Sequence, residues 1–293
     1  MKDLLLSLKK EPIRHESLHP SPLEATTQEG AGVTESSEST NIPAKLQTYQ
    51  TLYTNQLTQS HFFKHVARNP IPSFSKQDLT IGSILGTGGF CVVREVTEIH
   101  PLKGTTEMSP NVNAQHGGGD NDDDDDEETR LYMTENVYRA GKARYAIKRL
   151  RTDLSLTEDG ASQYRGMLDL ALEAEFLSHM HHPNIIRMRG RMACTNPVWT
   201  EGYFLVLDRL YGTLEEVIEG RWKEEVKKHS KFLGFRKKDK EQIRQLFQER
   251  LIVAYDIASV FRYLHENRIM YRDIKSENIG FDVRVSESEQ KID

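Results

Sequence analysis

The order of sequence patterns along the chain limits its fold more than any other feature. Between 78 and 210, runs such as "DLTIGSILGTGGFCVVREVTEI", "ARYAIKRL" and "GYFLVLDRL" predict strands, with one helix at 164–180 among them. Beyond 213 the pattern becomes helical, and the polar loop "YRDIKSENIGFD" follows a long amphipathic segment. Strands first and helices afterwards predict an α+β fold in two lobes.

The spacing of apolar residues also predicts which helix faces are buried. On the helix at 164–180, Leu170, Ala174 and Leu177 share one face. On the amphipathic segment "FQERLIVAYDIASVFRYLHENRI", the same spacing predicts a buried face made of Leu251, Ala254, Ala258, Phe261 and Leu264.

Two segments are too polar to predict packing. Residues 1–77 are rich in Ser, Thr, Glu, Gln and Pro, and we expect a disordered tail with a transient helix near "LQTYQTLYTNQL". The segment at about 100–141 is first glycine-rich and then strongly acidic, so self-repulsion predicts a solvated insert. Its aspartates lack the spacing of an EF-hand calcium loop.

Charge and composition exclude several classes. The net charge of −5 disfavours a general nucleic-acid binder. No apolar run approaches the roughly 20 residues of a membrane span, and the N-terminus lacks a secretory signal. The distant Cys91 and Cys194 show no pairing pattern, as expected of a reducing compartment. We therefore expect a cytoplasmic or nuclear protein.

Three motifs could carry chemistry. The glycine turn "LGTGGFCVV" would let backbone amides approach phosphate oxygens, although glycine turns between strands are also common structural features. Taken alone, Lys148 on a strand and Glu173 on a helix indicate only surface charge. The loop is more specific, because it holds a carboxylate, an amine and an amide together at Asp273, Lys275 and Asn278.

In this order, "GTGGFCVV", "AIK", a helix glutamate ahead of "HPNI" and then "RDIKSEN" resemble the signature set of eukaryotic protein kinases. The resemblance covers roughly 78–293. It implies a bilobal kinase domain with a complete β-rich N-lobe at 78–210, interrupted by the acidic insert, and only the start of the helical C-lobe at 211–293.

The resemblance implies ATP as a cofactor. Lys148 would neutralise the α- and β-phosphates and pair with Glu173. Glu173 is preferred to Glu175 because it precedes Pro183 of "HPNI" by the interval usual in the family. Leu207 would be the gatekeeper, and Asp208 and Leu210 would offer backbone groups to adenine. The complete set of nucleotide-binding residues implied is Leu85, Gly86, Thr87, Gly88, Gly89, Phe90, Cys91, Val93, Ala146, Lys148, Leu207, Asp208 and Leu210.

The same resemblance assigns the loop. Asp273 would accept or orient the proton of the substrate hydroxyl, Lys275 would stabilise the transferring phosphate, and Asn278 would bind Mg²⁺. A lysine two residues after the aspartate is typical of the serine/threonine type. In the terminal "KID", Asp293 is either the residue just before the metal-binding aspartate or that aspartate itself.

Four residues depart from the family pattern. Cys91 stands at the third glycine position, Tyr271 replaces histidine and Ser276 replaces proline. Gly280 stands where a larger apolar residue usually forms the floor of the adenine pocket. Without that larger side chain, ATP binding would lose about 1–3 kcal/mol unless a neighbour such as Phe281 fills the gap.

We therefore expect a protein serine/threonine kinase that phosphorylates a protein substrate. An upstream kinase or docking partner could bind the tail or the acidic insert. The family continues with an Asp-Phe-Gly segment and a helical lower lobe, so residues 1–293 alone are expected to bind ATP poorly, to transfer phosphate negligibly and to be unstable in isolation. The alternatives are a non-catalytic kinase-like interaction protein and, less favoured by "RDIKSEN", a small-molecule or lipid kinase.

Overall fold

The computed structural model describes residues 44–100, 122–152, 161–198, 200–230 and 237–282. Within them lies a six-stranded sheet of order β1-β7-β8-β6-β3-β2. Its strands are β1 (Ser73–Phe74), β2 (Leu79–Thr87), β3 (Cys91–Ile99), β6 (Tyr145–Leu150), β7 (Met188–Met192) and β8 (Phe204–Asp208). The predicted α+β class is confirmed, as are the two strands flanking the glycine turn.

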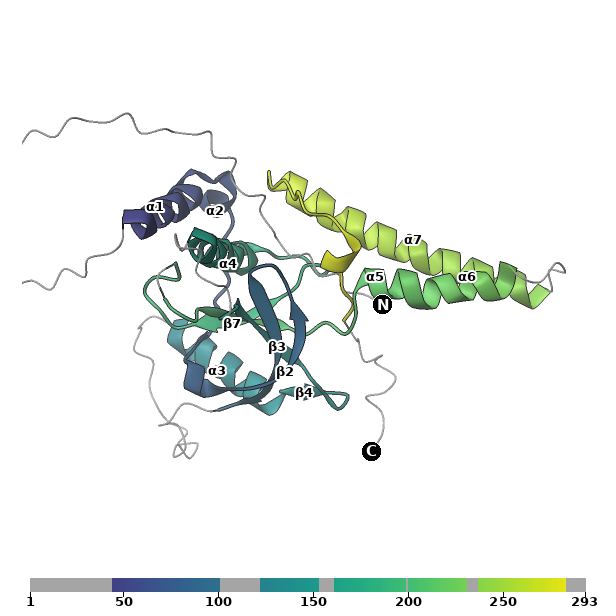
Figure 1. Cartoon of the computed structure of the whole chain (residues 1–293), viewed down its shortest axis with the longest axis horizontal. Helices are drawn as coiled ribbons and strands as arrows, with labels where there is room; N and C mark the ends of the chain where they lie inside the picture. Colours follow the sequence, from purple (N-terminus) through teal and green to yellow (C-terminus); the bar gives the residue numbers. More distant parts are fainter. Residues whose placement is uncertain (1–43, 101–121, 153–160, 199, 231–236, 283–293) are drawn as a thin grey trace, which may run out of the picture.

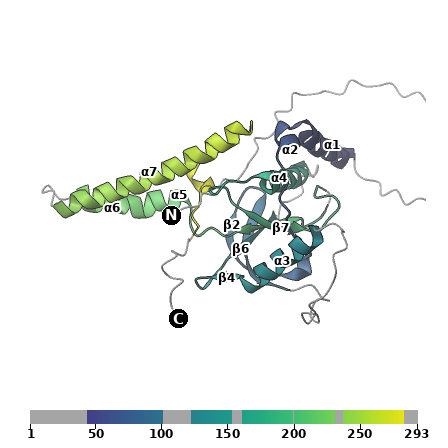
Figure 2. The same cartoon turned by 180° about the vertical axis from the view of Figure 1, so that it is seen from behind.

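Helices cover both faces of the sheet. Figures 1 and 2 show α4 (Ala161–His179) on one side and α3 (Asp122–Glu135) on the other. Because side chains alternate along a strand, Leu205 and Leu207 of β8 enter the core beneath α4, while Phe204 and Val206 pack with Met133 of α3. The sheet is therefore buried on both faces, which fits the nearly continuous apolar sequence of β8.

The residues between 44 and β2 correct the predicted disordered tail in part. Residues 44–77 form α1 (Ala44–Gln59), α2 (His61–His65), β1 and a short 3₁₀ turn, η1 (Lys76–Asp78). Its order comes from a few large side chains rather than from overall composition, because Tyr53, Phe62 and Phe74 are buried at 7%, 2% and 0% exposure. Residues 1–43 of that predicted tail lie outside the described residues.

The acidic insert is also partly ordered, which corrects the predicted solvated segment. Helix α3 buries Arg130 and Met133, and Arg130 forms an ion pair with Asp78 at 2.9 Å. The hairpin of β4 (Tyr138–Arg139) and β5 (Lys142–Ala143) follows. Both of its turn residues, Ala140 and Gly141, have positive φ, as a tight hairpin with right-handed twist requires. Residues 101–121 lie outside the described part.

The helical part begins after β8. It contains α5 (Leu214–Val217), the π-helical turn η2 (Ile218–Trp222), α6 (Lys223–Ser230), α7 (Lys237–Glu266) and η3 (Ser276–Asn278). Figure 1 shows α6 and α7 side by side, projecting from the sheet. Across the described ranges, no helix is long and apolar enough to cross a bilayer.

The predicted buried face of α7 is only partly right. Leu264 is buried and Phe261 is half-buried, but Leu251, Ala254 and Ala258 are exposed. The face that packs is rotated from the predicted one and carries Leu246, Val253, Val260 and Leu264. Both faces have apolar side chains at helical spacing, so the periodicity could not distinguish them.

Candidate active site

Adjacent strands gather most of the predicted nucleotide-binding residues. Val93 of β3 pairs with Lys148 of β6, and Ala146 of β6 pairs with Leu207 of β8. Directly paired residues point to the same face of a sheet, as do residues two apart on one strand. Val93, Ala146, Lys148 and Leu207 therefore share a single face, the one that α4 covers.

The predicted glycine turn lies at the edge of this face. Gly86 pairs with Val93, and the Gly88 amide donates to the Cys91 carbonyl at 2.7 Å, which closes the turn between β2 and β3. A Cβ added at Gly86 or Gly89 would meet no atom within 4 Å. Protein packing therefore does not require glycine at these two positions, whereas close approach of a ligand to the backbone would.

Lys148 and Glu173 form the most strongly connected pair of predicted residues. The Lys148 Nζ donates to both Glu173 carboxylate oxygens at 2.6 Å, and the two side chains are 14% and 8% exposed. Burial acts to lower the pKa of Lys148, but Glu173, with further contributions from Cys91 and Asp169, outweighs that effect and the net pKa is raised. The amine is therefore a fixed positive charge beneath the glycine turn.

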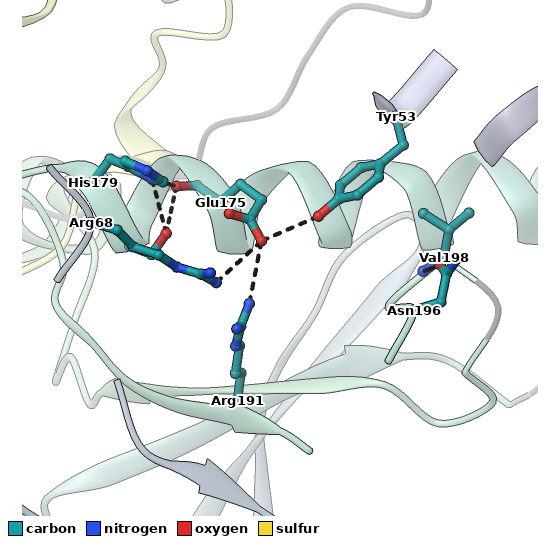
Figure 3. Close-up of polar contacts among 8 residues, drawn as sticks. Tyr53, Arg68, Glu175, His179, Arg191, Asn196 and Val198 are labelled. Carbon is teal, nitrogen blue, oxygen red and sulfur yellow. Dashed lines mark hydrogen bonds and ion pairs between the residues drawn. The ribbon is translucent and has the colours of Figure 1, made fainter. Parts of the chain in front are cut away.

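Glu175, the alternative partner weighed for Lys148, lies in a different environment. It accepts hydrogen bonds from Tyr53 Oη at 3.2 Å, Arg68 at 3.3 Å and Arg191 at 3.2 Å (Figure 3). The sequence predicted no role for these partners. The available signal was the pair of glutamates two residues apart on one helix, because such residues point in nearly opposite directions.

The segment after β8 connects the sheet to the helical part. Leu207 is buried, at 5% exposure. The Asp208 carboxylate accepts two bonds from Arg189, at 2.8 and 2.9 Å, and its backbone amide donates to Arg187 at 3.0 Å. The Asp208 side chain therefore faces the neighbouring strand β7, an arrangement compatible with the prediction that only its backbone contacts a ligand.

The polar loop is organised by Asn278. Its amide nitrogen donates to the Asp273 backbone carbonyl at 2.9 Å and to the Asp273 carboxylate at 2.8 Å. Asn278 is buried, Asp273 is half-buried and Lys275 is exposed. Both of these bonds use the nitrogen, so the amide oxygen occupies the other side of the group, where a hard cation could be bound.

The buried Tyr271 hydroxyl is influenced by the charges of both the loop and the pair on the sheet. Burial is the main cause of its raised pKa, and the negative charges of Asp273 and, more weakly, Glu173 add to it. Both carboxylates are therefore within electrostatic range of one buried phenol. Asp293, the remaining predicted metal-site residue, lies outside the described part.

Gly280 is explained by its neighbours. A Cβ at this position would lie 2.7 Å from Leu210 Cδ1 and 3.2 Å from the Gly212 carbonyl. Leu210 therefore supplies apolar volume at the position where the sequence had suggested Phe281. The glycine permits the close approach of the two chain segments at Thr213 and Gly280, which form a β-bridge.

A cavity of about 250 Å³ lies beside this connecting segment, but it is not the predicted nucleotide pocket. It shares only Asp208 and Leu210 with the predicted set. Arginines dominate the rest of its lining, with Arg139, Arg144, Arg187 and Arg189 among them. Over the described ranges, no three His, Cys, Asp or Glu side chains converge on a metal site.

Known proteins resemble this chain over part of its length. The family model described as "Protein kinase domain" matches residues 134–292, so the glycine turn lies outside the matched region. Aurora kinase B of Xenopus tropicalis is 34% identical over 110 residues, which cover 38% of this chain and 24% of that protein.

Two further relatives are similar at comparable levels. The inhibitor of nuclear factor kappa-B kinase subunit alpha of Gallus gallus is 32% identical over 137 residues, covering 47% of this chain and 15% of the relative. Serine/threonine-protein kinase Aurora-2 of Arabidopsis thaliana is 31% identical over 113 residues, covering 38% and 30%. The matched part of this chain thus spans less than a third of each of these curated relatives.

Proposed function

This chain belongs to the protein kinase family, and from that premise we propose that it is an ATP- and Mg²⁺-dependent protein serine/threonine kinase. One observation carries the proposal: Lys148 and Glu173 form a buried pair 2.6 Å apart on the face of the sheet beneath the glycine turn. Burying such a pair costs desolvation energy that apolar residues would avoid, so a functional reason for its presence is favoured.

The residues around the pair suit a nucleotide triphosphate. ATP, when bound, would supply the phosphoryl group that is transferred. Lys148 would neutralise phosphate oxygens, and the backbone at Gly86 and Gly89 would approach them without steric hindrance. Leu207 would lie beside the adenine, and Asp208 and Leu210 would contact it through the backbone.

The loop would provide the remaining groups. Asp273 would orient or accept the proton of a substrate hydroxyl, and its contact with Asn278 would fix its position. Lys275 would balance charge on the transferred group, and Asn278 would hold Mg²⁺ through its amide oxygen. The serine/threonine type rests on Lys275 and on the similarity to serine/threonine-protein kinase Aurora-2.

Further proposals follow from the family. We propose residues 78–293 as the kinase region, a protein as the substrate, and cytoplasm or nucleus as the location. An upstream kinase or docking partner would bind the N-terminal tail or the insert, and no nucleic-acid partner is proposed.

The decisive experiment uses a version of the protein that includes a full kinase domain, and it measures MgATP affinity and phosphate transfer to a generic protein substrate. Lys148→Met should weaken ATP binding at least about tenfold, because it removes the only charge in the buried pair that attracts phosphate. Asp273→Asn should abolish transfer and spare ATP binding. Lys228→Met, which removes an exposed lysine of α6, is the matched control.

If neither Lys148→Met nor Asp273→Asn changes any of these quantities, the assigned roles are wrong. If the unmodified protein with a full kinase domain binds no ATP, the kinase-like interaction protein becomes the better interpretation.

A further inference from the structure

Helix α4 carries two glutamates with different partners. Glu173 points to β6, where it binds Lys148, whereas Glu175 points to β7 and the N-terminal segment. Two residues along an α-helix differ in direction by about 200°, so these carboxylates lie on nearly opposite sides. Any contact that fixes Glu175 therefore also fixes the rotation of α4 and the direction of Glu173.

The N-terminal segment, residues 44–74, holds the outer side of α4. Tyr53 of α1 packs with Leu168, Ala171 and Leu172 of α4 and with Val198 from the β7–β8 loop. The ring of Phe62 stacks on Phe176 of α4 at a centroid distance of 5.8 Å. These contacts extend along most of the helix, so the packing is more extensive than a chance surface contact.

The same segment also reaches the C-terminal end of α4. The backbone amide of Asn69 donates to the Ser178 carbonyl at 2.7 Å, which satisfies one of the acceptors that a helix end leaves open. Farther along, β1 pairs in parallel with β7, so Ser73 stands opposite Arg191. The segment therefore contacts the side, the end and the supporting strand of α4.

Glu175 is the polar centre of this contact. It is bound by Tyr53 from α1, by Arg68 from the residues after α2, and by Arg191 from β7 (Figure 3). Its side chain is only 11% exposed. Burial first, and Glu175 second, raise the pKa of the Tyr53 hydroxyl, so Tyr53 keeps its proton and remains a donor.

We propose that residues 44–74 act as a built-in positioning segment for α4, and that Tyr53 and Arg68 are positioning residues which hold Glu175 so that Glu173 meets Lys148. The catalytic meaning of this contact rests on the proposed kinase function. The positioning itself is a property of the fold and can be tested without a nucleotide.

The first test measures how fast Lys148 reacts with an amine-acylating reagent, with the site quantified by mass spectrometry. When α4 rotates away, Lys148 loses the carboxylate that raises its pKa and also becomes more accessible. In the full chain, Tyr53→Phe and Arg68→Gln should therefore increase the acylation rate of Lys148 roughly three- to tenfold.

The matched control is Tyr145→Phe. It also deletes a buried phenol oxygen, but that hydroxyl has no hydrogen-bond partner within the described ranges and lies on the opposite face of the sheet. The control should leave the Lys148 acylation rate unchanged. If Tyr53→Phe and Arg68→Gln both behave like the control, the positioning proposal is overturned.

The second test compares the affinities of MgATP and adenosine for the same variants. Both ligands would use the adenine pocket, but only ATP has phosphates for Lys148 to bind. A positioning defect should therefore weaken ATP roughly three- to tenfold and leave adenosine unchanged. An equal loss for both ligands would indicate general unfolding and contradict the proposal.

The two proposals can fail separately. If Lys148 acylation accelerates in both variants but the unmodified chain binds no ATP, the positioning segment stands and the kinase proposal fails. If ATP binds and depends on Lys148 but acylation never changes, the reverse holds.

Discussion

Similar apolar side chains are buried to very different extents in two regions of the molecule. One region is the sheet with its flanking helices, and the other is the hairpin of α6 and α7. Phe74 of β1 is fully buried at 0% exposure, whereas Phe247 of α7 keeps 60% of its surface exposed. Leu251, Ile252 and Tyr255 on the same helix are also more than half exposed. Apolar content alone therefore does not indicate which part of this chain carries the stability.

The difference follows from the number of packed surfaces. The sheet has α4 on one face and α3 on the other, so its strands contribute to two cores. In the described residues, α7 buries one line of side chains, which includes Val253 and Val260. We expect the sheet to dominate the free energy of unfolding, and four predictions test this comparison.

The largest difference should come from matched Phe→Ala changes. Phe74→Ala removes a fully buried ring and should lower the free energy of unfolding by about 3–5 kcal/mol. Phe247→Ala removes a mostly exposed ring and should change it by less than about 0.5 kcal/mol. Urea titration of both variants measures this, and similar losses would contradict the comparison.

The next difference concerns two glycines. A Cβ at Gly190 of β7 would lie 2.3 Å from the ring of Phe74, so Gly190→Ala should destabilise the chain by about 1–3 kcal/mol. Gly220 in η2 has no atom within 4 Å of that position, and Gly220→Ala should stabilise by up to about 1 kcal/mol. If thermal melts of the two variants shift in the same direction, the predicted contrast between Gly190 and Gly220 is refuted.

A third effect depends on pH. Burial acts to raise the pKa of Asp78, but hydrogen bonds from Ser75 and Arg130 outweigh it and lower the pKa from 3.8. A lowered folded-state pKa adds stability that is fully present above pH 3.8 and is lost as the pH falls through the folded-state value. Asp78→Asn should therefore destabilise by about 1–3 kcal/mol near neutral pH, and by progressively less in acid.

Measuring unfolding of both forms between pH 2 and 7 tests this prediction. A difference that does not depend on pH would show that the Asp78 charge contributes nothing.

The smallest effect should come from an ion pair of the hairpin. Lys223 lowers the pKa of Glu219 one turn away, but both side chains are more than half exposed. Solvent and salt screen such pairs. Glu219→Gln should therefore leave the urea midpoint unchanged at all pH values, and a measurable loss would mean that the hairpin is more tightly held than its exposure suggests.

The sequence predicted those parts of the fold whose local pattern is compatible with only one type of secondary structure. The β-branched runs around Gly86–Gly89 have the strand period, and the helix at 164–180 is apolar enough to be buried on several sides. It predicted only a transient helix where α1 is found, and it missed α3, because the average composition of both segments is polar. Each of these helices is held by one or two large side chains, Tyr53 in α1 and Met133 in α3, and these become visible only when their partners are known.

Prediction of the site had a similar limit. Register distinguished Glu173 from Glu175, and the structure has Glu173 beside Lys148. The partners of Glu175 could not be predicted, because Tyr53 and Arg191 come from segments far apart in the sequence. The sequence suggested Phe281 as one neighbour that could fill the volume beside Gly280, but Leu210 is the side chain nearest to it, since sequence adjacency is a poor guide to contact across a bridge.

The contact between α1 and α4 also has a consequence for how the chain folds during synthesis. Tyr53 and Glu175 are 122 residues apart, so at about 5–20 residues per second the ribosome needs on the order of ten seconds to produce the second after the first. During that interval Phe62 has no Phe176 to stack on. The segment that is made first can fold only after most of the chain has emerged, and its large rings must remain in water until then.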